Sequence, residues 1–213
     1  MKNLIFIGGG GFFLELYDYI QDDYLFLKEF KLKGVLDDNV KLDQALLPYL
    51  GTISAYQPRP DDVFLVTLGN VINRDKFFRL LEDKGAEFIT YLHPSSIVSR
   101  SALMGKGCIV APGSIVNAKA IVEDNVVINV HCSVGHESKI GFSSVLSPYS
   151  AVNGNAVVGS QCFLGTRATV FPGKEIGNKS IIDSHSYVKS DAPEKSIVSV
   201  RGDYVVVKNR LMR

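Results

Sequence analysis

A histidine followed by a glutamate, His136-Glu137, is the pair of residues in this sequence best suited to acid–base chemistry. An imidazole takes up a proton near neutral pH, and a neighbouring carboxylate can fix its tautomer and stabilise its cation. Eighteen residues further on lies Gly154, and eighteen beyond that Pro172. A groove of small residues could bind an extended ligand, and a histidine at the end of that groove could act on the ligand as a general base. The alternative is an exposed turn histidine.

The residues around this pair follow a strict repeat of six. From Val98 to Val188 every sixth residue is aliphatic except Met104, and the residue two positions earlier is almost always Ser, Ala or Cys. This period is typical of a parallel β-helix in which both positions point inward. An antiparallel β-sandwich would need turn signals about every 8–12 residues and would tolerate drift. We expect about five triangular coils of 18 residues, which places His136 at a corner and above Gly154.

A second corner of the predicted β-helix carries polar and aromatic side chains. His131, Tyr149, Arg167 and His185 are spaced by 18 residues and should stack. They could form a solvated ladder, a contact between subunits or part of a site.

The first 93 residues have the pattern of an α/β domain, which we expect to be Rossmann-like. An apolar run ends in Gly8, Gly9, Gly10 and Gly11, and a helix is predicted over 12–22. Strand, glycine turn and helix can bind a phosphate, although a plain tight turn is the alternative and Phe13 replaces the third glycine of a dinucleotide fingerprint. Further strands are predicted at 33–36, 62–67 and 87–92, and a helix at 71–84. Asp37 and Asp38 follow the second strand and could accept hydrogen bonds from a nucleoside or form a solvated turn.

Composition narrows the class of protein. The chain has 213 residues and a net charge of +1, which gives no indication of nucleic-acid binding. No apolar run reaches the roughly 18 residues needed to cross a membrane, and the N-terminus lacks signal-peptide features, so we expect a cytoplasmic protein. The three cysteines occupy the small inward position of the repeat, which favours buried thiols over disulfides or a metal site. We divide the chain into residues 1–93, a β-helix at 94–193, and a tail at 194–213 that packs back as a strand.

The glycine-rich α/β domain followed by an uninterrupted hexapeptide β-helix with His136-Glu137 at its corner resembles the bacterial nucleotide-sugar N-acetyltransferases. This family includes the UDP-4-amino-sugar and perosamine N-acetyltransferases, with a sialic acid O-acetyltransferase as a relative. The resemblance implies a left-handed β-helix, a homotrimer, acetyl-CoA as donor, a nucleotide-linked amino sugar as acceptor and no metal. It implies His136 as the general base and Glu137 as the residue that orients it. The implied substrate-binding residues are Gly8, Gly9, Gly10, Gly11, Asp37, Asp38 and Asn70, and the implied acyl-CoA-binding residues are Gly154, Gly165, Gly173, Ser184 and His185.

Four segments depart from the family's pattern. Phe12-Phe13 stands where a His-Gly pair is common, which should narrow or reshape the acceptor pocket. Val145 replaces a second histidine of the family, and the segments 183–186 and 199–203 replace its usual donor-site sequences, so that His185 or Arg201 could contact the donor instead. These changes leave two alternatives to N-acylation of a sugar amine: O-acetylation of a sugar, or a non-catalytic trimer that binds sugar nucleotides or acts as a scaffold.

Overall fold

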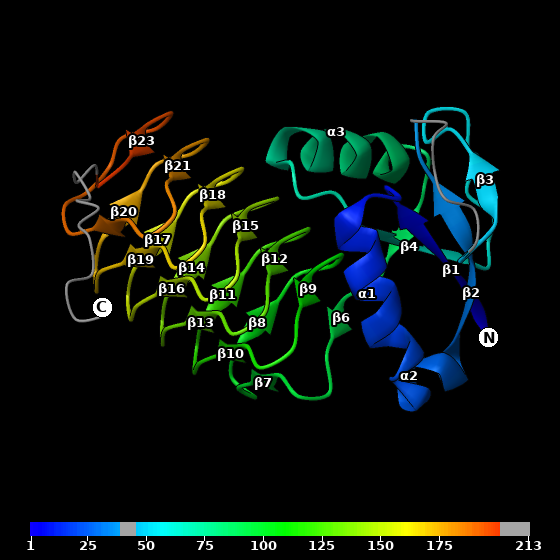
Figure 1. Cartoon of the computed structure of the whole chain (residues 1–213), viewed down its shortest axis with the longest axis horizontal. Coiled ribbons are helices and arrows are strands. Elements are labelled where there is room, and N and C mark those ends of the chain that lie inside the picture. Colours follow the sequence, from blue (N-terminus) through cyan, green and yellow to red (C-terminus); the bar gives the residue numbers. More distant parts are fainter. Residues whose placement is uncertain (39–45, 201–213) are drawn as a thin grey trace, which may run out of the picture.

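The N-terminal lobe is built on a parallel sheet whose strands are short apolar runs. The structure is a computed structural model that describes residues 1–38 and 46–200. Five strands pair in parallel in the order β3-β2-β1-β4-β5 (Figure 1). Their bounds are β1 Lys2–Ile7, β2 Phe30–Leu36, β3 Tyr49–Gly51, β4 Asp62–Val66 and β5 Glu87–Phe88. Parallel strands buried on both faces read as continuous apolar runs, as β1 and β4 do here.

Helices cover both faces of this sheet. The side chains of Leu4 and Phe6 on β1 pack with helix α1 (Gly11–Gln21), while Ile5 and Ile7 on the same strand pack with helix α3 (Val71–Glu82). Successive strand residues point to opposite faces, which explains the division. A short helix α2 (Tyr24–Glu29) follows α1. The α/β class of this lobe is confirmed, and the finer assignment to a Rossmann-like fold stays a prediction.

One predicted strand is two separate strands in the structure. Of the residues 87–92, β5 (Glu87–Phe88) pairs with β4 in the N-terminal sheet, whereas β6 (Tyr91–Leu92) pairs with β9 in the second lobe. The chain therefore passes from one lobe to the other within four residues. The structure also contains α2 and β3, which the sequence pattern did not predict.

The second lobe is a parallel β-helix, as the repeat of six predicts. Two-residue strands recur every six residues and pair with strands 18 residues away, which gives three sheets of seven, six and five strands. The first sheet contains β6, β9 (Ile109–Val110), β12 (Val127–Ile128), β15 (Val145–Leu146), β18 (Phe163–Leu164), β21 (Ile181–Ile182) and β23 (Ile197–Val198). The second contains β7 (Ile97–Val98), β10 (Ile115–Val116), β13 (Ser133–Val134), β16 (Ala151–Val152), β19 (Thr169–Val170) and β22 (Tyr187–Val188). The third contains β8 (Leu103–Met104), β11 (Ile121–Val122), β14 (Lys139–Ile140), β17 (Val157–Val158) and β20 (Glu175–Ile176).

The expected count of about five coils is too low. The seven strands of the first sheet exceed it for two reasons: β6, six residues before β7, adds a rung before Val98, where the expected repeat was counted from, and β23 adds one after the repeat is interrupted at about residue 190. Pairing of β23 with β21 confirms that the start of the tail returns as a strand. The interior is a single column of the aliphatic and small residues that the repeat places inward, including the buried Cys108, Cys132 and Cys162.

The two lobes share a hydrophobic core. Phe13 and Leu16 of α1 belong to the same buried cluster as Ile109, Val127 and Val145, which point outward from the first sheet of the β-helix. α3 also lies along this side of the β-helix (Figure 1). The N-terminal lobe is thus seated on one face of the solenoid.

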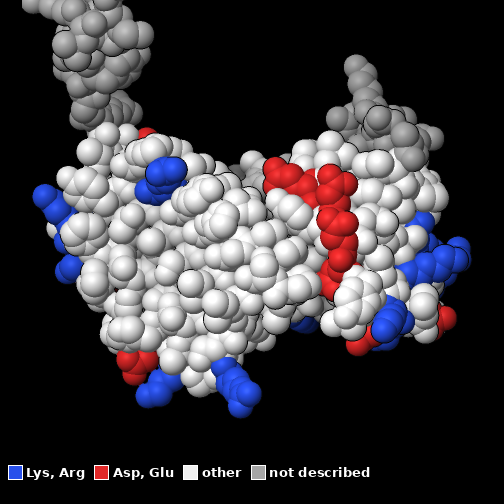
Figure 2. Space-filling view, turned by 60° about the horizontal axis from the view of Figure 1, so that its bottom comes forward, with Lys and Arg blue, Asp and Glu red and all other residues white. Residues whose placement is uncertain are grey.

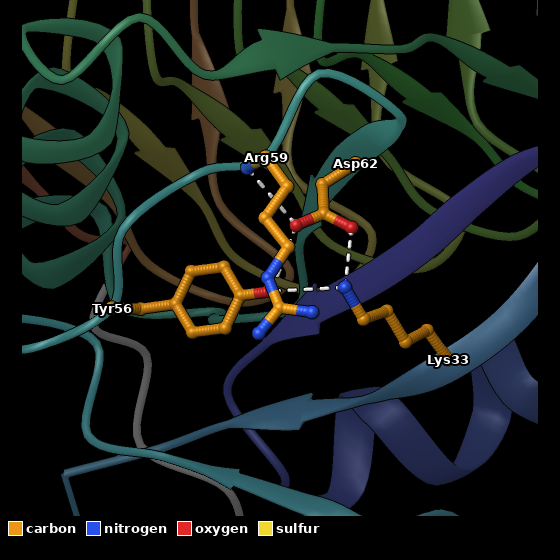
Figure 3. Close-up of polar contacts among 4 residues, drawn as sticks. All are labelled: Lys33, Tyr56, Arg59 and Asp62. Carbon is orange, nitrogen blue, oxygen red and sulfur yellow. Dashed lines mark hydrogen bonds and ion pairs between the residues drawn. The ribbon is translucent and has the colours of Figure 1, made fainter.

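A polar cluster around the buried Asp62 joins β2 to the start of β4 in the N-terminal sheet. The register of β1 and β2 slips at Lys33, which is an extra residue on β2. Such a bulge re-aims a side chain, and Lys33 Nζ donates to the buried carboxylate of Asp62 at 2.5 Å. The hydroxyl of Tyr56 and the backbone N–H of Arg59 donate to the other oxygen of Asp62 (Figure 3). The cluster ties the segment before β4 to β2.

Candidate active site

His136 and Glu137 lie at the corner between β13 and β14. Nδ1 of His136 lies 3.2 Å from Oε2 of Glu137. Because a carboxylate only accepts hydrogen bonds, this contact places the imidazole hydrogen on Nδ1 and leaves the lone pair on Nε2. Glu137 adopts φ 56°, a left-handed backbone that the corner requires. The two side chains are 62% and 47% exposed, so a partner can reach them.

Gly154 lies directly against the His136 ring. A Cβ built on Gly154 would lie 2.5 Å from His136 Nε2. The structure therefore brings Gly154 to the pair, as the spacing of 18 predicts. Gly173, one coil further, donates its N–H to the carbonyl of Gly154 at 3.0 Å and has open space around its Cα. Gly154 thus leaves room for the imidazole ring at Nε2, and the open side of Gly173 lies one coil further.

The glycine turn and the aspartates of the N-terminal lobe meet at the carboxyl ends of β1 and β2. The N–H of Gly9 donates to Asp37 Oδ2 at 2.7 Å, and Asp38 Oδ1 accepts from the N–H of Ile53 at 2.8 Å. Gly10 is the N-cap of α1, and both Gly10 and Gly11 are exposed. Asp37 is thus part of the glycine turn itself.

Asn70 has a structural role that the sequence reasoning did not include. Its Oδ1 accepts hydrogen bonds from Ile72 N and Asn73 N, which makes it the N-cap of α3. It remains exposed beside Gly69, at the carboxyl end of β4. The residues predicted to bind the acceptor therefore lie at one end of three neighbouring strands.

The remaining predicted donor residues lie at a different corner. Gly165 and Ser184 touch, because a Cβ on Gly165 would lie 2.6 Å from Ser184 N. Ser184 and His185 lie between β21 and β22, whereas His136 lies between β13 and β14. The structure separates these residues from His136 by the width of the second sheet.

The predicted ladder at that corner is confirmed for three of its four members, and His185 shares their left-handed backbone, with φ 59°. The rings of His131 and Tyr149 stack with centroids 5.0 Å apart, and the guanidinium of Arg167 lies 5.1 Å from the ring of Tyr149. All three residues have positive φ and are exposed. Stacking and cation–π attraction hold this corner together.

The segments that depart from the family's pattern have different surroundings. Phe13 is 3% exposed and packs edge-on against Phe6, so it is a core residue. Val145 is buried between the lobes. Ser199 and Val200 lie at the end of the described chain, and Arg201, Gly202 and Asp203 lie outside the described residues.

The described residues contain neither a metal-binding cluster nor a membrane-spanning helix. Within residues 1–38 and 46–200, no group of three or more His, Cys, Asp or Glu side chains could hold a metal ion. In the same part of the chain, no helix combines the length and apolar character that a membrane span requires.

Known proteins resemble this chain in sequence over about half of its length and in fold over nearly all of it. The chain matches no protein-family model. It is 32% identical over 115 residues to the UDP-N-acetylbacillosamine N-acetyltransferase of Bacillus subtilis (strain 168). That match covers 52% of this chain and 51% of the relative, or about half the length of each. PerB from Caulobacter crescentus, solved with CoA and GDP-perosamine, superposes with a TM-score of 0.84 at 26% identity and covers 95% of this chain and 98% of PerB. The chain is thus similar to bacterial nucleotide-sugar N-acetyltransferases in about half of its sequence and in nearly its whole fold.

A second solved structure is similar to this chain in fold. The acetyltransferase domain of PglB from Neisseria gonorrhoeae FA1090, solved with acetyl coenzyme A, gives a TM-score of 0.83 at 23% identity and covers 92% of this chain and 95% of that domain. Both lobes therefore recur together in this group of proteins.

Proposed function

We propose that this protein transfers an acyl group, acetyl in the first instance, from acyl-CoA to the amine of a nucleotide-linked amino sugar used in surface glycan synthesis. The observation that carries the proposal is the exposed His136–Glu137 pair, with Nε2 free beside Gly154. The similarity to PerB, which was solved with CoA and GDP-perosamine, supports the two substrates. We expect the reaction to take place in the cytoplasm.

The chemistry requires one base and no metal. Nε2 of His136 takes a proton from the sugar amine as the amine nitrogen attacks the thioester carbonyl. The C–S bond then breaks, the amide forms, and the CoA thiolate leaves and is protonated. Glu137 keeps the hydrogen on Nδ1 and stabilises the imidazolium. Attack is direct, without a covalent enzyme intermediate.

The acceptor would be held by the N-terminal lobe. Exposed N–H groups at the start of α1 suit a phosphate, because the N-terminus of a helix carries partial positive charge. Asp37 and Asp38 would accept hydrogen bonds from the nucleoside, and Asn70 would border the sugar. α1 and the residue after it carry the exposed acids Glu15, Asp18 and Asp22, and Figure 2 shows an acidic stripe beside the β-helix. This charge would attract the cationic form of an amino sugar to this side of the protein, before loss of a proton frees the amine for attack.

The donor site would be completed by a second subunit in a homotrimer. In one chain His136 is exposed, and Ser184, His185 and Gly165 lie at another corner, so that only a neighbouring copy could bring such a corner to His136. The face between these corners is the second sheet, which lies on the largely uncharged side of the β-helix in Figure 2. Its outward residues are Ile97, Ile115, Ser133, Ala151, Thr169 and Tyr187. An uncharged face of this kind is suited to burial between subunits. Light scattering that gives the mass of a monomer at micromolar concentration would contradict this assembly.

The deciding experiment combines acyl-CoA donors with amine-bearing nucleotide sugars. Purified protein is incubated with acetyl-CoA and either GDP-perosamine or a UDP-4-amino sugar, and release of CoA thiol is followed. We expect turnover with at least one acceptor and a loss of at least about 100-fold in kcat for His136→Ala, since general bases contribute about 10²–10⁴-fold. Lys119→Ala, an exposed neighbour of Glu137, is the control. Unchanged kcat in His136→Ala would exclude His136 as the base, and thiol release with a 4-hydroxy sugar instead would favour O-acetylation.

A further inference from the structure

Arg74 is a fully buried cation at the junction of the two lobes. It lies on α3 and is 0% exposed, among the largest fully buried side chains of the described chain. Within residues 1–38 and 46–200 it forms no ion pair with a carboxylate, and burial lowers its pKa to about 9. Burying a charge without a counter-ion is unfavourable unless its hydrogen bonds are made. An arginine kept in such a place must therefore be held by other acceptors.

Its acceptors are backbone carbonyls from both lobes. In the N-terminal lobe, Nη1 donates to the carbonyls of Val66 and Leu68, at the end of β4 and in the loop that follows. In the β-helix, Nε donates to the carbonyl of Asn125 at 2.7 Å, and Nη2 donates to that of Gly107 at 3.3 Å. One planar guanidinium thus joins the loop after β4 to two consecutive coils of the β-helix.

The β-helix returns a hydrogen bond to the same residue. The side-chain amide of Asn125 donates to the carbonyl of Arg74 at 3.2 Å and to Ser143 Oγ at 2.7 Å, one coil further. Asn125 is fully buried and adopts φ 59°. The contact is therefore reciprocal and extends over three coils.

The loop that Arg74 holds supports the glycine turn. The single hydroxyl of Thr67 lies within hydrogen-bonding distance of two carbonyl oxygens, those of Ile7 at 3.0 Å and Gly8 at 2.5 Å. The side chain of Leu68 lies so close to Gly8 that a Cβ there would meet Leu68 Cδ2 at 2.5 Å. Asn70 then begins α3. Any shift of residues 66–70 would be transmitted to the glycine turn through these contacts.

We infer that Arg74 is a positioning residue for the acceptor: its guanidinium fixes the loop 66–70, and through it the glycine turn, relative to the β-helix that carries His136. This inference rests on the proposed function. Replacing Arg74 with lysine should therefore impair acceptor binding. Lysine keeps the charge, but it lacks the several N–H groups of the guanidinium and cannot reach carbonyls on both lobes at once. Acceptor binding should weaken, while the donor site and the base stay intact.

The test compares Arg74→Lys with Leu81→Ala. Leu81 is a fully buried residue on the same helix, in the apolar cluster that α3 forms with β1 and β4, so its truncation reports a loss of stability. For Arg74→Lys we expect a rise of about tenfold in the KM and Kd of GDP-perosamine or the UDP-4-amino sugar. The kcat should fall as well, because the bound amine is displaced relative to His136. The Kd of acetyl-CoA should stay within about twofold, and hydrogen exchange at residues 66–70 should be faster. Leu81→Ala should lower Tm without the change in KM.

A second variant covers the case in which Arg74→Lys does not fold. Asn125→Gly keeps the positive φ of the corner but removes the donation to Arg74, so it should raise the KM of the acceptor in the same direction. An unchanged acceptor KM in both folded variants, or equal changes in Leu81→Ala, would overturn the inference and leave the acyltransferase standing. A wild-type protein that binds the nucleotide sugar but releases no CoA would overturn the acyltransferase, and Kd alone would then decide the role of Arg74.

Discussion

The imidazole of His136 lies directly against the backbone of Gly154, one coil further along the β-helix, with only 2.5 Å between Nε2 and the position that a Cβ would occupy. The contact exists because residues 18 apart stack in register, so the histidine ring can lie flat only where the next coil has no side chain. A glycine at 154 is thus a condition for the orientation of the base.

Replacing Gly154 with alanine should displace this ring. Because a misplacement of about 1 Å can lower a rate by about 10²-fold, we expect kcat to fall by that order for Gly154→Ala while the KM values change little. Steady-state kinetics with acetyl-CoA and the amino-sugar acceptor measure this. Gly141→Ala is the matched control, since a Cβ there would meet the backbone of Gly159 at 2.5 Å but no histidine. Equal losses of kcat in both variants would mean that the effect is one of stability.

Glu137 should affect catalysis only through its contact with His136. In Glu137→Gln the amide can donate as well as accept, so the hydrogen is no longer held on Nδ1 and the imidazolium loses its carboxylate. We expect kcat to fall by about tenfold with the Kd of acetyl-CoA unchanged. Lys119→Ala removes the more distant partner of Glu137, 3.7 Å from Oε1, and should change kcat by less than about twofold because the pair is exposed. A larger fall in kcat for Lys119→Ala would show that the ammonium group of Lys119 takes part in the active site.

The β-helix could be predicted from sequence because its information is local. Each repeat of six contains its own inward aliphatic and its own corner, and a fixed spacing of 18 then sets the register of every strand, including His136 over Gly154. The coil count failed at the two ends of the β-helix. β6 continues the spacing of six one step before Val98, where the count began, and β23 follows an interruption of the repeat at about residue 190. The left hand of the coil, the domain boundaries and the roles of the site residues stay predictions.

The junction of the lobes could not be predicted in the same way. Arg74 looks like an ordinary helix residue in sequence, and its partners Gly107 and Asn125 lie 33 and 51 residues away. Phe13 was expected to shape the acceptor pocket because it replaces a glycine. Its position on α1, three and seven residues before the buried Leu16 and Ile20, instead directs it into the core.

The cluster around Asp62 should give the N-terminal lobe a dependence on pH. Burial alone would raise the pKa of Asp62, but hydrogen bonds from Lys33, Tyr56 and the N–H of Arg59 lower it below its ordinary value. A carboxyl whose folded pKa is depressed contributes stability above its unfolded pKa, about 3.9, and this is lost as pH falls through the folded value. Asp62→Asn should therefore lower the free energy of unfolding at pH 7 by about 2 kcal/mol.

Urea unfolding at several pH values measures this difference. The difference should be constant between about pH 5 and pH 8. It should narrow as the pH falls below about 4, because the unfolded chain then takes up a proton at Asp62 that the folded protein takes up only at lower pH. Asp61→Asn, an exposed neighbour, is the control and should change stability by less than about 0.5 kcal/mol. A difference that stays constant down to pH 2 would show that the carboxylate charge does not stabilise the cluster.

Truncation of Phe13 should affect stability and leave acceptor specificity unchanged. Its ring lies 5.2 Å from that of Phe6 and 5.9 Å from that of Tyr17, within the cluster that joins the lobes. Phe13→Ala removes a fully packed aromatic ring, so we expect the free energy of unfolding to fall by about 3–5 kcal/mol. Phe12→Ala, which truncates the half-buried neighbour, should lower it by less. If Phe13→Ala instead left stability unchanged and lowered the KM of the nucleotide sugar, Phe13 would line the acceptor pocket and its burial in the core would not hold in solution.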